Sequence, residues 1–296
     1  MNRRTLLMVI ALFVATAAWA WTTATTKERH TMTGLVLKVD PAHKTMTVSC
    51  QEVPGYMDAM TMPFDVREAK MLDGLKPGTT VDFTLVVDGD SSYAENIHVR
   101  QYENLEQEPL EARRLALLSN LDNPAATANA LAPEQAVPDF VLTDQNRQRV
   151  SFAQLKGKVV ALTFAYIRCP NPSYCFRLSN NLGQLRKRFG DQLGRDLVLL
   201  TIIIDPEHDQ GEALANYARI WKADPHTWHF LTGPVPEVKR VSALFGMDFW
   251  KDEGFLTHSF HTAVIDRQGK IVANLEGNQF TAQQLGDLVQ TVMGCP

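Results

Sequence analysis

The sequence predicts two domains of different class: a small antiparallel β-barrel, followed by an α/β domain with a central parallel sheet. Three observations support this expectation. Apolar and polar residues alternate through residues 31–102, near-continuous apolar runs of strand length occur beyond residue 137, and a segment rich in Ala, Pro and Asn separates the two. The chain has 296 residues, which is enough for two ordinary domains.

The composition excludes several classes of protein. Apolar residues make up 45% of the chain and charged residues 21%, as in folded rather than disordered proteins. The net charge of −4 provides no broad basic face, so nucleic acid is not an expected partner. Four cysteines are too few for a disulfide-dense scaffold.

Residues 1–22 have the pattern of an export signal or a membrane anchor. Two arginines precede an uncharged, mostly apolar run, and Ala18-Trp19-Ala20 supplies the small residues of a cleavage site. As a helix, Thr5–Trp21 would be roughly 26 Å long, close to the thickness of the hydrocarbon core of a bilayer. Cleavage after Ala20 and retention as an inner-membrane anchor both stay open. In either case the remaining chain is expected in the periplasm, where disulfides persist.

Residues 31–102 carry strand signals separated by turns. Asp40-Pro41-Ala42-His43 is typical of a turn, and Lys76-Pro77-Gly78 is another. Such turns, recurring between alternating segments, are typical of a small antiparallel barrel or sandwich. Strands are predicted at Thr33–Val39, Lys44–Cys50, Thr79–Asp88 and Ser91–Val99.

Residues 103–136 are expected to form a helix and a flexible linker. Leu105–Leu121 spaces its leucines at helical intervals, and Glu111 and Arg114 form an i, i+3 charge pair. Asn123–Pro138 follows with little to bury. Such a tether would keep two binding sites at high effective concentration.

Residues 137–294 predict the α/β domain. Val159–Tyr166 and Leu197–Ile204 are near-continuous apolar runs, which suit central parallel strands covered on both faces. Later segments predict helices at Leu178–Phe189, Glu212–Trp221 and Ala282–Val292, and a hairpin from His261–Asp266 and Ile271–Leu275. The order of strand, helix, strand, helix, hairpin and helix is that of a thioredoxin-like domain.

Cys169 and Cys175 flank a segment directly after the first apolar run. Two prolines between them oppose a helix, so this segment is expected to loop and to bring the two sulfurs together. Cys175 then lies near the start of the next helix, where partial positive charge, with Arg168 and Arg177 nearby, favours a thiolate. An inert disulfide, a redox pair and a soft-metal site all stay open.

His258 is the expected third ligand if this site binds copper, because Cu(II) favours mixed nitrogen and sulfur ligands. It lies in a predicted loop before a strand, and His261 is a rival three residues on. Asp205 and Asp209 follow the second apolar run at the same sheet edge, where they either orient a ligand or loop or form a cap and a solvated turn. Of the neighbouring residues, Trp228 and Phe230 are expected in the core, and His226 and His229 without a metal role.

These residues resemble those of the Sco/SenC family over Val137–Val292. The matching pieces are Val137-Pro138-Asp139-Phe140, Tyr166-Ile167-Arg168-Cys169-Pro170, Asp205-Pro206-Glu207, Trp228-His229-Phe230-Leu231-Thr232-Gly233 and His258-Ser259 before Val264-Ile265-Asp266. The family consists of thioredoxin-fold copper proteins involved in building the CuA centre of cytochrome c oxidase. The resemblance implies that Cys169, Cys175 and His258 bind copper. The family's usual spacing is CxxxC, whereas this chain has CxxxxxC. The longer loop affects whether the pair is suited to copper delivery or to thiol redox chemistry.

The first domain also contains a cluster of sulfur donors. Met60 and Met62 are two residues apart, so on a strand both point to one face, and Cys50 ends the preceding strand and could meet them across the sheet. Thioether and thiolate sulfurs suit Cu(I) or Ag(I). A hydrophobic stripe with Met as a flexible filler is the structural alternative.

This segment resembles the CusF-like periplasmic copper-binding domains, which are five-stranded barrels of the OB type. Their M-x-M pair maps to Met60 and Met62. Cys50 stands where they carry a histidine, and Met57 where some carry a tryptophan over the metal. Exchanging imidazole for thiolate is expected to retain the Cu(I) preference and to expose the site to oxidation.

Two segments of one exported chain therefore point to copper. The predicted function is a periplasmic copper chaperone, supplied by periplasmic copper donors, that delivers copper to the cytochrome c oxidase subunit with the CuA site. A thiol–disulfide oxidoreductase that reduces the CuA cysteines through Cys169 and Cys175 is the enzymatic alternative. A copper-resistance buffer without a specific client is a third. For Cys295, a free thiol, a modified thiol and a pairing with Cys50 all stay open.

Overall fold

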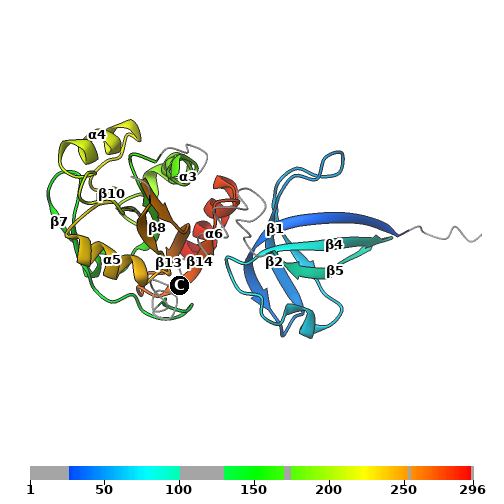
Figure 1. Ribbon diagram of the computed structural model, residues 1–296. Coiled ribbons are helices and arrows are strands. Elements are labelled where there is room, and N and C mark those ends of the chain that lie inside the picture. Colours follow the sequence, from blue (N-terminus) through cyan, green and yellow to red (C-terminus); the bar gives the residue numbers. More distant parts are fainter. Residues whose placement is uncertain (1–26, 101–129, 170–174, 253–254, 295–296) are drawn as a thin grey trace, which may run out of the picture.

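The computed structural model describes residues 27–100, 130–169, 175–252 and 255–294. The predicted export signal, the Leu105–Leu121 helix and Cys295 lie outside these ranges. Figure 1 shows a barrel-like domain, in blue and cyan, beside a larger α/β domain, with helix α6 on the side of the larger domain that faces the barrel. Within the described ranges, no helix has the length and apolar character needed to cross a membrane.

The first domain is an antiparallel sheet, as the alternating pattern predicts, and it has five strands, one more than the four predicted. Its order is β3-β2-β1-β4-β5, and a bridge between Val66 and Ala94 brings the end of β3 to β5, so the sheet curls toward closure. The first strand begins earlier than expected because its N-terminal half pairs with β4 rather than β2. The elements are β1 (Glu28–Asp40), β2 (Thr45–Cys50), β3 (Thr61–Asp65), the 3-10 helix η2 (Ala69–Leu72), β4 (Thr80–Asp88) and β5 (Ser91–Val99).

The second domain has the predicted thioredoxin-like architecture around a sheet of order β10-β9-β8-β13-β14. Strands β8, β9 and β10 are parallel, and β13 is antiparallel to β8 and β14. Every residue of β8 and β9 is buried, as their continuous apolar runs predict for strands covered on both faces. The sheet consists of β8 (Val159–Ala165), β9 (Leu197–Ile203), β10 (Trp228–Leu231), β13 (His261–Ile265) and β14 (Ile271–Glu276).

Helices cover both faces of this sheet. Helices α3 (Cys175–Arg188), α4 (Glu212–Ile220) and α6 (Ala282–Gly294) contribute to the apolar cluster on one face, and α5 (Val235–Ala243) to that on the other. Trp228 is fully buried, as expected for a core residue. Smaller elements are β6 (Val141–Thr143), β7 (Arg149–Ser151), β11 (Phe249–Asp252), β12 (Phe255–His258) and the 3-10 helices η5 (Phe152–Leu155) and η6 (Gly190–Gln192).

The two domains share a hydrophobic cluster. Leu35 and Leu37 of β1 are 0% and 3% exposed, and they belong to the cluster formed by α3, α6 and the sheet of the second domain. Gly78 approaches so closely that a Cβ there would lie 2.7 Å from the Cβ of Ala273. The barrel is therefore docked on the second domain, an arrangement that the expectation of a flexible tether did not include.

Candidate metal centres

Cys169 and the backbone of Cys175 lie at the carboxyl edge of the central sheet, and the predicted loop between them, 170–174, lies outside the described residues. Strand β8 ends at Ala165, and the N–H of Cys169 donates to the carbonyl oxygen of Tyr166 at 3.2 Å. The side chain of Cys169 is partly buried against the apolar cluster on the α5 face. Cys175 is the first residue of α3, the position at which a helix terminus favours a thiolate.

His258 lies at the same edge, on a strand rather than in the expected loop. It is the last residue of β12 and pairs with Phe249 of β11. The pairing gives His258 the extended backbone of a strand. The next strand, β13, is antiparallel to β8 with Thr262 opposite Thr163. Because antiparallel partners run in opposite directions, the start of β13 lies beside the end of β8. His258 shortly precedes β13 and Cys169 shortly follows β8, so both belong to this edge of the sheet.

The imidazole of His258 has a defined orientation. Its Nδ1 lies 2.7 Å from the carbonyl oxygen of Ser259, and its ring meets Phe260 edge-on with the centroids 4.8 Å apart. A carbonyl oxygen only accepts, so Nδ1 is the donor, and in the neutral ring this tautomer has its lone pair on Nε2. Metal-binding histidines commonly have this arrangement, in which one ring nitrogen donates to a backbone oxygen and the other binds the metal.

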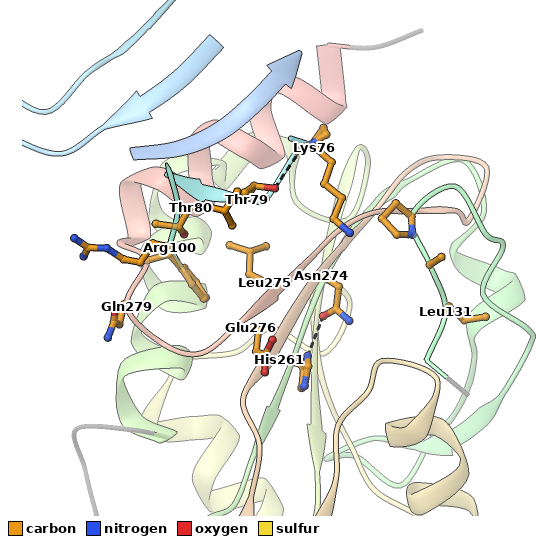
Figure 2. A pocket seen from close by; sticks show the side chains of 16 residues that line it. Lys76, Thr79, Thr80, Arg100, Leu131, His261, Asn274, Leu275, Glu276 and Gln279 are labelled. Carbon is orange, nitrogen blue, oxygen red and sulfur yellow. Dashed lines mark hydrogen bonds between the residues drawn. The ribbon is translucent and has the colours of Figure 1, made fainter. Parts of the chain in front are cut away.

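His261, the rival ligand, belongs to a different feature. Its Nδ1 lies 3.3 Å from Oδ1 of Asn274, and burial lowers its pKa to about 4, so the imidazole is neutral. Figure 2 shows His261 and Asn274 lining a cleft between the domains, with Lys76 entering from the barrel. The cleft has a volume of about 710 Å³.

Two buried carboxylates hold the segment that leads to Cys169. Asp209 is 1% exposed and accepts a hydrogen bond from the N–H of Ile167 at 2.7 Å. Asp205 is 4% exposed and accepts one from the guanidinium of Arg168 at 2.5 Å. These contacts agree with the expectation that the two acids orient a loop at this edge.

The pKa values of the two carboxyl groups move in opposite directions. Burial raises the pKa of Asp209 to about 6. Burial also acts to raise the pKa of Asp205, but hydrogen bonds from His208 and Arg168 outweigh it and leave this pKa below its usual value. Asp209 is therefore the acid of this edge that takes up a proton first on acidification.

The arginines near the thiols are already engaged. Arg168 pairs with Asp205, and Arg177 donates to the carbonyl oxygen of Gln279 at 3.1 Å. The expected support of these two cations for a thiolate is thus reduced, and the terminus of α3 is the remaining positive feature. Ligand atoms of Asp205, Glu207 and His208 also lie within 4.8 Å of one another, a grouping that the sequence analysis missed. Its two carboxylates are hard donors that suit Cu(I) poorly.

Cys50 and Met62 lie on the inner face of β2 and β3, and Met60 directly precedes β3. The N–H of Cys50 donates to the carbonyl oxygen of Met60 at 2.9 Å, and Val48 is paired with Met62. Residues opposite each other in an antiparallel pair point to one face, so Cys50, Met60 and Met62 point the same way. Met57 and Met62 pack against the barrel core that contains Cys50. The strand register thus puts these residues on one side of the sheet, and their joint binding of a metal stays a prediction.

These donors differ in their access to solvent. Cys50 is 1% exposed, and burial raises the pKa of its thiol to about 12, whereas Met60 is 48% exposed. A metal ion that enters through Met60 and binds Cys50 must therefore displace a proton from that thiol. The ring of Tyr56 stacks on His30 with a centroid distance of 3.4 Å and fixes the loop before Met57, a contact that the sequence did not suggest.

Both donor sets fit copper chemically. Three thioethers and one thiol are all soft donors, which suit Cu(I) and leave hard cations poorly bound. Two thiols with an imidazole form a mixed sulfur and nitrogen set, which suits Cu(II) as well as Cu(I). The fold is that of a thioredoxin-like domain joined to a small barrel, and each of the two carries a candidate soft-metal site.

Family comparison identifies both parts. The SCO1/SenC family model matches residues 128–294, more than half of the chain, and the protein belongs to the SCO1/SenC family. A model described as copper binding periplasmic protein CusF matches residues 29–99. Copper is thus the metal associated with each half.

Individual relatives agree with this assignment. A protein of Stutzerimonas stutzeri named for copper binding is 31% identical over 173 residues, which are 53% of this chain and 81% of that protein. A SCO2-like protein of Rickettsia typhi is 26% identical over 142 residues, which are 45% of this chain and 66% of the relative.

Solved structures of similar proteins match the second domain. The structure of Arabidopsis thaliana ScoI with copper bound is 24% identical with a TM-score of 0.47, covering 53% of this chain and 98% of that one. A SCO1/SenC family lipoprotein of Bacillus anthracis is 23% identical with a TM-score of 0.49, covering 55% of this chain and 98% of that one.

Proposed function

We propose that the protein is a periplasmic copper chaperone that delivers copper to the CuA centre of a cytochrome c oxidase. The observation that carries the proposal is the placement of Cys169, Cys175 and His258 at the carboxyl edge of one sheet, with the imidazole in the tautomer whose Nε2 binds metals. Family membership supports it, because one of the relatives is named for copper binding.

In this scheme copper is cargo that passes between sulfur donors. The first domain takes Cu(I) from periplasmic donors through the exposed Met60, and then through Met57, Met62 and the thiol of Cys50, which gives up its proton. The second domain takes copper on its two thiols and imidazole and presents it to the oxidase subunit with the CuA site. Each step exchanges one ligand for another and needs no electron transfer. Anchoring to the inner membrane by residues 1–22 is part of the proposal.

A thiol–disulfide oxidoreductase is the second candidate, favoured by the position of Cys175 on the terminus of α3. A thiolate of the reduced pair would attack a disulfide of the CuA cysteines and form a mixed disulfide. The other thiol of the pair would then resolve it, which leaves the CuA cysteines reduced and Cys169 and Cys175 oxidised. This reaction has no need of His258.

Copper stoichiometry tests the chaperone proposal. Anaerobic Cu(I) titration of the reduced soluble protein is expected to give two equivalents in the wild type and one each in Cys169→Ser and in Met60→Ala with Met62→Ala. Met71→Ala is the matched control, because this partly buried methionine packs on the same barrel core but is not one of the predicted ligands. Less than one equivalent in the wild type contradicts the proposal.

His258→Ala separates the two candidate functions. The chaperone requires weaker copper binding at the second site of this variant, whereas the oxidoreductase requires an unchanged rate of disulfide reduction and normal oxidase assembly. A copper-resistance buffer predicts that deleting the whole chain causes copper sensitivity while CuA assembly stays normal.

A further inference from the structure

Helix α6 of the second domain lies on the outer face of the strands that carry the sulfur donors. Leu35, Ser49 and Thr61 are opposite one another across β1, β2 and β3, so they form one row across the sheet. Side chains alternate between the two faces of a strand. The row therefore faces away from the inner-face donors Cys50 and Met60, which are its neighbours in sequence.

One carboxylate of α6 bridges two strands of this row. Oδ2 of Asp287 accepts a hydrogen bond from the hydroxyl of Ser49 at 2.7 Å and another from the hydroxyl of Thr61 at 2.9 Å. Its Oδ1 pairs with Arg188 of α3 at 2.7 Å, and the side chain is only 13% exposed. Asp287 thus links β2 to β3 from outside and is itself fixed to the second domain.

Two amides of the same helix hold the backbone next to the donors. The amide of Gln284 donates to the carbonyl oxygen of Ser49 at 3.1 Å, and that of Gln283 donates to the carbonyl oxygen of Ala59 at 3.0 Å. Ser49 directly precedes Cys50, and Ala59 directly precedes Met60. Each of these hydrogen bonds from α6 therefore falls on a residue adjacent in sequence to a sulfur donor.

We propose that Asp287 is a positioning residue for the sulfur-rich copper site of the first domain. It contacts none of the donors. It acts through Ser49 and Thr61 and keeps β2 and β3 in the register that aligns Cys50 with the M-x-M pair. The strand β3 has five residues and is the first in the sheet order, so α6 restrains it in addition to its pairing with β2 and the Val66–Ala94 bridge beyond its end.

This inference rests on the proposed function in one respect, namely that the sulfur cluster binds Cu(I). It has a further consequence for the two domains. If docking of α6 favours the copper-binding register, then copper in the first site must stabilise the docking by the same free energy. The second domain would thereby sense whether the first domain is loaded.

The test uses the full chain with Cys169→Ser, so that only the first site titrates, and measures Cu(I) affinity by anaerobic competition with a chromogenic chelator. Asp287→Ala is expected to weaken binding about tenfold, the lower end of the range for residues that support ligands without touching the metal. Asp287→Asn keeps an oxygen that accepts the two hydroxyl hydrogen bonds and is expected to restore most of the affinity. Asp191→Ala, which removes an exposed carboxylate of the same domain, is the matched control.

Two further readings separate positioning from general stabilisation. The ultraviolet absorption of the Cu(I)–thiolate bond is expected to fall in Asp287→Ala, because Cys50 leaves its place beside the methionines. Adding Thr61→Val to Asp287→Ala is expected to cause no further loss, since both changes remove the same hydrogen bond.

The outcomes keep this inference distinct from the proposed function. Failure of the Cys169→Ser protein itself to bind one Cu(I) removes the proposed function and the inference together. Binding of one Cu(I) with an unchanged affinity in Asp287→Ala overturns the inference alone, even if the melting temperature falls. If Asp287→Ala does not fold, Thr61→Val is read instead, and an unchanged affinity there overturns the inference equally.

Discussion

The two candidate copper sites are built by different structural means. In the first domain the donors lie on paired strands, and the register of β2 with β3 sets their relation. In the second domain the donors lie at the ends of three separate elements, namely after β8, at the start of α3 and at the end of β12. A sheet register offers few alternative arrangements, whereas element ends can adjust independently. The first site is thus suited to holding one kind of ion, and the second to accepting and releasing it.

Their surroundings differ as much as their frameworks. Cys50 is enclosed by apolar side chains, and burial alone raises its pKa. Cys169 follows a segment held by Asp205, Asp209 and Arg168, so its neighbourhood is rich in charge. The two thiols therefore differ in access: Cys50 is buried, whereas Cys169 is only partly buried.

Thiol reactivity gives the largest expected contrast between the two regions. In the reduced metal-free protein near pH 7.5, we expect iodoacetamide to alkylate Cys169 at least about 1000-fold faster than Cys50. Few thiolates form at a pKa of about 12, and burial blocks the reagent as well. Peptide mass spectrometry over time measures both rates in one sample. Similar rates in the folded protein would show that the two thiols are not distinguished in this way, and denaturation should make the rates equal.

The hydrophobic cluster shared by the two domains allows a test of whether they unfold separately. Leu35 of the barrel is fully buried in the cluster of the second domain, and every tryptophan beyond residue 26 lies in that second domain. We expect Leu35→Ala to lower the free energy of unfolding followed by tryptophan fluorescence by about 3 kcal/mol, as for other buried leucines. Leu75→Ala, at a partly buried leucine of the barrel's own core, is the control. An unchanged fluorescence transition in Leu35→Ala would mean that the domains unfold independently.

Much of the fold could be predicted because its main strands carry strong patterns. The continuous runs of β8 and β9 and the alternation in β2 and β4 place these strands within one residue of their observed bounds. Helix α5 and the β11–β12 hairpin were not predicted. Helix α5 has nine residues with prolines at its start, and the hairpin strands have four residues each, too few for a period to emerge.

The positions of the candidate site residues on their strands and sheet edges could also be predicted, because they follow from the same strand patterns. The spacing of Met60 and Met62 determines their common face, and a residue after a central strand lies at a sheet edge. The contacts of Asp287 could not be foreseen, because its partner Ser49 is 238 residues away. The sequence around either residue contains no pattern that indicates the other. Domain docking did leave a signal: Leu35 and Leu37 flank the inward-facing Val36, so β1 is apolar on both faces.

The pH dependence of copper binding gives a smaller contrast, of about 100-fold between pH 6 and pH 8. With a pKa of about 12 in the folded metal-free state, the thiol of Cys50 is protonated throughout this range. Binding of Cu(I) to its sulfur therefore releases one proton at every pH, and the apparent affinity of the first site rises about tenfold per pH unit. The sign is upward with pH, and no plateau is expected below the pKa.

Competition titrations at several pH values in the Cys169→Ser background measure this slope, once the known protonation of the chelator is subtracted. Cys50→Ser provides the control, because its three remaining thioether donors carry no proton to lose, and its weaker binding is expected to be independent of pH. A flat profile for the intact sulfur site would mean that Cu(I) is held by the methionines alone and that Cys50 is part of the barrel core. In that case only the candidate site of the second domain would bind copper through cysteine.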